Sequence, residues 1–175
     1  NFSGGTVDET GGGLLLAGSN VSQTGGTIPS ITMDGGNVSL TQSGGGTIGD
    51  LTMSTTSTLS LASDVTVTGN LTKTTGNVTI QGATSTRTLS IGGDFTQTTG
   101  TFANTNLALV FNGTVAQSLN KTTGGTINCG ITVNKTSGTA SLAGQAFQTT
   151  GAFTMQAGTI SLGNFDLDLN STFTY

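Results

Sequence analysis

The sequence contains no histidine, no tryptophan, one proline and one cysteine in 175 residues. Without histidine, the common nucleophile–base pairs and the histidine-containing zinc sites are excluded. The single cysteine, Cys129, excludes an internal disulfide and a thiolate cluster. Because it lies beside apolar residues in the segment 126–131, we interpret Cys129 as a small buried hydrophobic residue rather than an intermolecular or reactive thiol.

Charged residues are equally scarce at 7%, with four Lys and Arg against eight Asp and Glu, for a net charge of −4. Four cations cannot line a groove that follows phosphates, so we expect no nucleic-acid partner. The longest apolar run, Leu14–Ala17, is too short to span a bilayer. The chain also starts at Asn1 without a basic and apolar leader, which is typical of a mature secreted chain or of a trimmed fragment.

The sequence is instead rich in glycine, threonine and serine. It contains 29 glycines, and its apolar share is 33%. The apolar residues alternate with Thr and Ser in short segments such as 59–61, 65–68, 89–91, 107–111 and 131–133. A period of two predicts β-strands with one apolar face. No apolar stripe at helical spacing is long enough for a helix, so the pattern predicts an ordered all-β protein.

One tetrapeptide, Gln/Lys-Thr/Ser-x-Gly, recurs along the chain. Its six copies begin at Gln23, Gln42, Lys73, Gln97, Lys121 and Gln148. A second motif, Gly-Thr followed by Val, Ile or Phe, recurs with its degenerate copies every 20 to 30 residues. Such a period indicates stacked repeats. We therefore predict one domain over residues 1–175, a parallel β-solenoid of about six to seven coils. The tetrapeptide is expected to mark one corner of each coil, with Lys73 and Lys121 on the surface.

An antiparallel β-sandwich or barrel is the alternative fold, because its strands also follow one another every 8 to 12 residues. An antiparallel meander does not require the same corner motif to recur every 20 to 30 residues, so the solenoid is favoured.

The segment 89–169, which begins LSIGGDFTQTTGTFANTNLALVFNG, resembles the repetitive β-solenoid segments of large secreted bacterial surface proteins and adhesins. Residues 1–50 resemble them more loosely. In those segments, units of the form GxFTxxxGTFxxxxxTLxFNGxxxQSL recur. The resemblance implies a right-handed parallel β-helix, an extracellular or cell-surface location and a structural or adhesive role. It implies no catalytic residue.

Carboxylates can act as catalytic pairs, since two acids can hydrolyse a glycosidic bond, or as metal ligands. Asp34, Asp50, Asp64 and Asp94 each lie beside Gly or Ser at expected corners, where Asp caps turns through its side chain. Asp166 and Asp168 lie two apart, which indicates a solvated strand face more than a weak cation site. We expect no enzyme, no catalytic residue, no metal and no cofactor.

Sequons of the form Asn-x-Ser/Thr are unusually frequent, and they make covalent glycans possible partners. The nine candidate glycosylation sites are Asn1, Asn20, Asn37, Asn70, Asn77, Asn112, Asn120, Asn134 and Asn170.

The last eleven residues, 165–175, form the cleanest alternating pattern, with Phe165, Leu167, Leu169, Phe173 and Tyr175 on one side. Two interpretations remain: a last coil that packs on its own domain, or a strand that pairs with a second copy by β-augmentation. A head-to-tail contact that does not close would give a filament.

The expected function is that of a non-enzymatic extracellular structural protein, a subunit of a fibre, filament or adhesive stalk whose partner is itself. The alternatives are a carbohydrate-binding adhesin or an ice-binding module. Thr-x-Thr triplets at 56–58, 66–68 and 99–101 suit ice binding, but they do not recur at one position of every coil.

Overall fold

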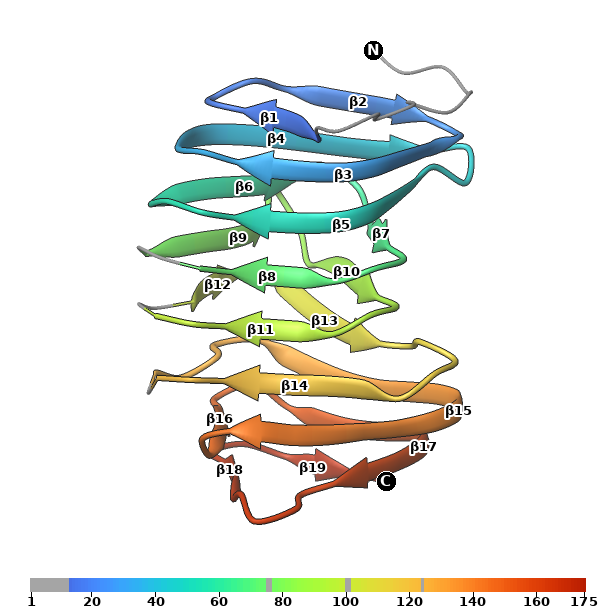
Figure 1. The fold of residues 1–175 in the computed structure, drawn as a ribbon, viewed down its shortest axis with the longest axis vertical. Helices are drawn as coiled ribbons and strands as arrows, with labels where there is room; N and C mark the ends of the chain where they lie inside the picture. Colours follow the sequence, from blue (N-terminus) through green and yellow to red (C-terminus); the bar gives the residue numbers. More distant parts are fainter. Residues whose placement is uncertain (1–12, 75–76, 100–101, 124) are drawn as a thin grey trace.

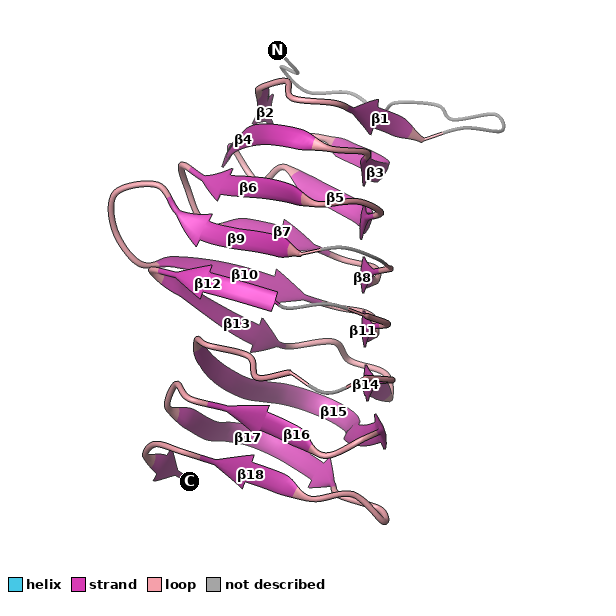
Figure 2. Cartoon of the chain, turned by 90° about the vertical axis from the view of Figure 1, so that its left-hand side faces the viewer, coloured by secondary structure: helices cyan, strands magenta, loops and turns pink. Residues whose placement is uncertain are grey.

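The structure is a computed structural model, and it describes residues 13–74, 77–99, 102–123 and 125–175. It is a parallel β-solenoid of about seven turns, as predicted, with no helix in the described residues (Figure 1). All strand pairs that the structure describes are parallel, so the antiparallel alternative is wrong. Figure 2 shows the strands stacked in layers across the long axis.

The coils have three faces, which we name A, B and C. Face A contains β2 (Val21–Thr24), β4 (Gly36–Ser43), β6 (Ser57–Leu61), β9 (Val78–Gly82), β12 (Phe102–Thr105), β16 (Phe147–Thr149) and β18 (Leu167–Leu169). Face B contains β7 (Val65–Val67), β10 (Arg87–Ile91), β13 (Leu107–Phe111) and β19 (Phe173–Thr174). Face C contains β1 (Leu14–Leu16), β8 (Leu71–Lys73), β11 (Phe95–Gln97) and β14 (Gln117–Lys121).

Four strands run around the corner between faces B and C and join these two faces into one 12-stranded sheet. They are β3 (Thr27–Met33), β5 (Thr47–Met53), β15 (Gly130–Gly144) and β17 (Phe153–Ser161). Each coil thus contributes three short segments, and no coil buries its inner side chains alone.

The core consists of columns in which each coil places an apolar side chain beneath that of the previous coil. One column on face B runs Ile28, Ile48, Val67, Ile91, Phe111 and Val133, each with at most 1% of its surface exposed. The outward neighbours are mostly Thr, Ser and Asn, so the period of two read from the sequence reflects in-and-out alternation.

The corner tetrapeptide does not occupy a single corner. Gln23 and Gln42 lie together at the end of face A, where the glycines that follow adopt positive φ, as at Gly25 (φ 90°). Lys73, Gln97 and Lys121 instead stack at the end of face C. Gln148 is shifted by one position, so that Thr149 points inward in its place. The prediction of one recurrent corner was therefore wrong.

Candidate functional site

The interior of face C changes from apolar to polar halfway down the stack. One inward column runs Leu16, Met33, Met53, Lys73, Gln97 and Lys121. The two lysines have at most 1% of their surface exposed, so the prediction that they lie on the surface was wrong. Their aliphatic stems pack in the core while the Lys73 ammonium donates to the Thr99 carbonyl and the Lys121 ammonium to the Gly125 carbonyl. Lys121 Nζ also lies 5.8 Å from the centre of the Phe147 ring.

A third buried amine, Lys135, forms a denser polar network at the corner of faces B and C. Its Nζ donates to the carbonyls of Gly113 (2.6 Å) and Val115 (2.8 Å) and to Oε1 of Gln117 (2.7 Å). The Gly113 N–H also donates to this Oε1, and Gln117 Nε2 donates to the Ile91 carbonyl at 2.9 Å. Lys135 thus holds the 112–116 loop to the coil below. The sequence around Lys135 does not indicate this network, because its three acceptors lie 18 to 22 residues earlier in the chain.

Burial lowers the pKa of the Lys73, Lys121 and Lys135 amines below their ordinary value of 10.5. The unfolded chain then binds more protons than the folded chain between these lowered values and 10.5, so stability should rise with pH across that window. We expect a higher free energy of unfolding at about pH 10 than at about pH 7, measured by urea titration. A Cys129→Ala background removes the buried thiol, so that the amines account for the measured change. A free energy of unfolding that stays constant or falls between these pH values would contradict the expectation. The double substitution Lys73→Met with Lys121→Met should reduce the increase.

The acidic side chains at the corners bind main-chain N–H groups, as expected for capping residues. Asp50 Oδ1 accepts from Asn70 N at 2.6 Å, Asp64 Oδ1 from Thr88 N at 2.9 Å, and Asp94 Oδ1 from Ser118 N at 2.7 Å. In each case the donor belongs to the following coil, so these carboxylates tie neighbouring coils together. Asp34 accepts from the Ser54 hydroxyl of the next coil at 3.4 Å.

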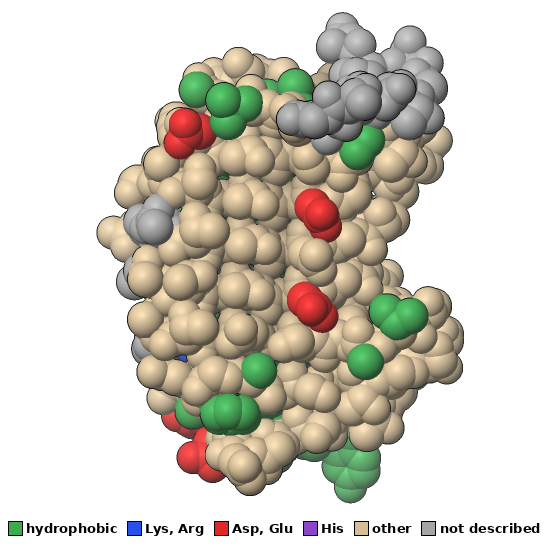
Figure 3. All heavy atoms as spheres, viewed as in Figure 1, with side chains coloured by type: hydrophobic (Ala, Val, Ile, Leu, Met, Phe, Trp, Pro, Cys, Tyr) green, Lys and Arg blue, Asp and Glu red, His purple; other side chains and the backbone are tan. Residues whose placement is uncertain are grey.

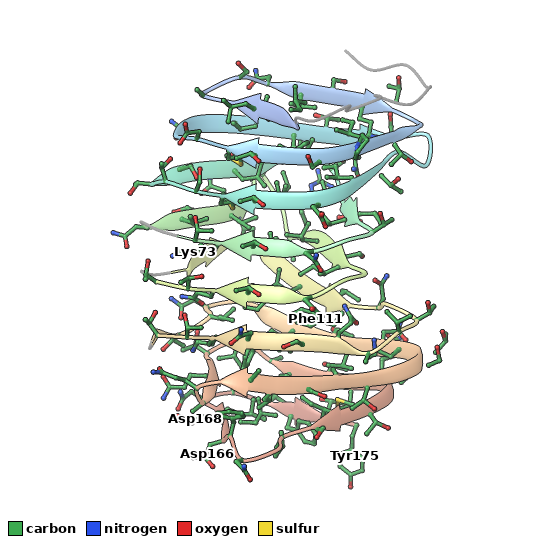
Figure 4. All side chains as sticks on the ribbon, viewed as in Figure 1. Lys73, Phe111, Asp166, Asp168 and Tyr175 are labelled. Carbon is green, nitrogen blue, oxygen red and sulfur yellow. The ribbon has the colours of Figure 1, made fainter. Side chains whose placement is uncertain are left out.

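The other acidic residues and the cysteine do not form a common cluster in the part of the chain that the structure describes. The described residues contain no group of three or more Cys, Asp or Glu that could hold a metal ion. Asp168 accepts from Gln148 Nε2 at 2.9 Å, and Asp166 is exposed beside it (Figure 4). Cys129 is 5% exposed and belongs to the core, which confirms the interpretation of it as a buried hydrophobic residue.

An open hollow of about 340 Å³ lies at the corner of faces B and C, where the margin at the right of Figure 3 is indented. It forms because the 112–116 loop projects beyond the shorter corners of the coils before it. Its lining includes Thr66, Thr68, Asn112 and Thr114, together with the exposed Val115, and it contains no titratable group. The hollow can offer hydroxyl and amide hydrogen bonds but no acid or base.

The predicted glycosylation sites fall at corners and strand ends, and their side chains differ in exposure to solvent. Asn20, Asn37, Asn77, Asn112 and Asn170 are exposed, while Asn1 lies outside the described residues. Asn70 is also exposed, but its Oδ1 accepts from Asp94 N at 2.7 Å. Asn120 and Asn134 are half-buried. Glycosylation stays a prediction, with the first five as the most accessible acceptors.

The predicted assembly strand is two strands rather than one. Leu167 and Leu169 lie on β18 of face A, whereas Phe173 lies on β19 of face B, with a corner between them. These side chains nevertheless continue the inward columns, because Leu167 pairs with Phe147 and Phe173 with Phe153. Half-buried Phe165 packs against the same core. They therefore belong to the inward columns of two faces of the coil rather than to one face of a single strand, and their pairing with a second copy stays a prediction.

The C-terminal end of the stack leaves apolar surface open. The rings of Phe153, Phe173 and Tyr175 form a ladder with centroid spacings of 6.1 and 5.9 Å. Phe173 is 47% exposed and Tyr175 is 96% exposed, and Tyr175 projects from the lower end in Figure 4. The lower edges of β18 and β19 have no strand partner among the described residues. At the opposite end, β1 pairs with β3 and with no other strand of the described residues.

No protein-family model, curated protein or solved structure shows a significant match to this chain. The described part of the chain holds no helix long and apolar enough to cross a membrane.

Proposed function

We propose that the chain is a non-enzymatic extracellular structural protein that extends a fibre, filament or adhesive stalk by stacking end to end. The observation that carries this proposal is the aromatic ladder at the C-terminal end, in which the buried Phe153 is followed by the exposed rings of Phe173 and Tyr175. An exposed strand edge over apolar side chains is a template for another strand, which proteins otherwise shield. The end strands of the described residues, β1 at one end and β18 and β19 at the other, belong to parallel ladders of the same kind, so a second copy can continue the ladder.

The mechanism is axial stacking without a reaction. Within the chain, each coil is tied to the next by main-chain hydrogen bonds, by the core columns and by capping residues such as Asp50 and Asp94. Between copies, β1 and β2 of one subunit would pair with β17 and β18 of another, and Phe173 and Tyr175 would enter the new core. Burying one such side chain fully contributes about 1.5–3 kcal/mol. The outward Thr, Ser and Asn keep the sides polar and are available for glycans.

The test is the molar mass in solution, measured by size-exclusion chromatography with light scattering over a roughly tenfold concentration range. We expect association that grows with concentration for the unmodified chain and a monomer for Phe173→Asp. Val115→Asp is the matched control, because Val115 is equally apolar and 67% exposed but lies on the side of the stack. The proposal fails if the unmodified chain stays monomeric throughout, or if Phe173→Asp associates as well as the control does.

A further inference from the structure

Face C carries a regular array of hydroxyl groups on its outer side, which faces the viewer in Figures 1 and 3. Its central column is formed by Thr32, Thr52, Thr72, Thr96 and Asn120, on five successive coils. A flanking column two residues further along each coil is formed by Ser54, Thr74, Thr98 and Thr122. We call these nine residues the threonine array.

The array is ordered in two directions. The central members are direct partners in the parallel ladder, so successive coils place them about 4.8 Å apart. The flanking members follow the strand ends, where main-chain hydrogen bonds such as Ser54 N to the Met33 carbonyl and Thr74 N to the Met53 carbonyl continue the coil spacing. They lie two residues, about 6.6 Å of extended chain, beyond the central column. Oxygen atoms in hexagonal ice repeat on the same two scales along perpendicular axes of its surface. A flat sheet face with this repeat can therefore hold a patch of ordered water that continues into the ice lattice.

The hydroxyls of the two columns differ in their hydrogen bonds to the protein, and this difference suits the binding of ordered water. In the flanking column, Ser54 Oγ donates to the Met33 carbonyl at 3.0 Å and Thr122 Oγ1 to the Thr98 carbonyl at 2.7 Å, which fixes their orientation. In the central column, the hydroxyls of the four threonines have no partner within the described part of the protein. The flanking column is thus pre-organised, and the central column is free to bond an external oxygen.

The chemistry of the face favours crystalline water over a sugar or a charged partner. No aromatic side chain occurs in either column, whereas sugar rings are held in large part by stacking on aromatic faces. Three acids border the array. Asp34 lies at the head of the flanking column and accepts from the Ser54 hydroxyl at 3.4 Å, while Asp50 and Asp94 lie in the adjacent column and accept from main-chain N–H groups. Figure 3 shows the centre of this face without acidic or basic side chains, with acidic groups at its right and at its upper left.

We infer that the threonine array is an ice-binding surface. The other faces supply the comparison: on face A, Thr58 and Thr79 are partners in one outward column, and Asn37 precedes them. On face B, Val110 interrupts the outward column between Ser90 and Thr132. The array on face C is the longest run of hydroxyls and amides in two adjacent columns among the described residues.

The experiment is uptake of the purified chain into slowly grown ice, together with thermal hysteresis. Thr72→Tyr and Thr96→Tyr each place a bulky ring in the middle of the array, while Thr79→Tyr makes the same change at an outward position of face A. We expect the unmodified chain and Thr79→Tyr to enter ice and to depress its growth temperature, and both array variants to lose these effects. Circular dichroism and melting temperatures verify that all variants are folded.

Three results would overturn the inference. They are exclusion of the unmodified chain from ice, equal loss of uptake in Thr79→Tyr and Thr72→Tyr, and full uptake by folded array variants. Retention on crystalline cellulose or chitin without uptake into ice would assign the face to a polysaccharide instead. None of these results depends on whether copies stack end to end.

Discussion

Replacing Phe95 by alanine should lower the free energy of unfolding by about 3–5 kcal/mol. Phe95 is fully buried on β11 in the middle of the stack. Its ring contacts Phe111 at 6.1 Å and Phe147 at 6.3 Å between centroids, both edge to face, and so links three levels of the core. Truncation leaves a cavity that the fixed coil spacing keeps from collapsing, since each coil is bonded to the coils above and below it.

The effect of Phe95→Ala is measured by urea unfolding followed by circular dichroism. Phe173→Ala is the control, because it removes the same ring from the end of the stack, where 47% of the side chain is already exposed. We expect this control to cost at most about 1 kcal/mol. Equal losses at the two positions would show that the middle of the stack is not a continuous packed core.

Replacing Lys135 by methionine should destabilise the fold by about 3 kcal/mol, because a buried charged donor is removed from three acceptors. The carbonyls of Gly113 and Val115 would lose their ammonium partner, and Gln117 Oε1 would keep only the Gly113 N–H. Methionine has similar length and no donor, so it removes the hydrogen bonds with little loss of packing.

Lys73→Met is the matched control for this substitution. Lys73 is equally buried, but among the described residues it donates to a single carbonyl, and its column already holds Met33 and Met53 in the coils before it. We expect Lys73→Met to change the free energy of unfolding by at most about 1 kcal/mol, because the loss of one hydrogen bond is offset by the removal of a desolvated charge. If Lys135→Met proves as mild as Lys73→Met in thermal and urea unfolding, the network does not hold the 112–116 loop.

The architecture could be predicted from the sequence because stacking imposes a repeat. Alternation of Leu, Ile and Val with Thr and Ser identified the strands, and the recurrence of Gly-Thr motifs identified the coil. The corner roles of Asp50, Asp64 and Asp94 followed from their Gly and Ser neighbours. The donors that they bind did not follow, because these come from the next coil about 20 to 24 residues away.

Aligning the copies of the corner tetrapeptide could not reveal the polar interior or the threonine array. The tetrapeptide that begins at Gln23 and at Lys73 occurs at two different corners, so aligning its copies shifts face A onto face C. Alignment on Ile/Leu/Phe-Thr-x-Thr/Ser, as in 51–54, 71–74 and 95–98, brings the array into register. The burial of Lys73, Lys121 and Lys135 depends on carbonyls at distant corners, which no local pattern records.

The most direct test of end-to-end stacking is electron microscopy of the purified chain at increasing concentration, with diffraction from aligned material. The account predicts unbranched filaments one solenoid wide, with a meridional spacing of about 4.8 Å because the strands lie across the axis. Filaments should be absent from Phe173→Asp and present in Val115→Asp. Single short particles of one length at every concentration would contradict the account.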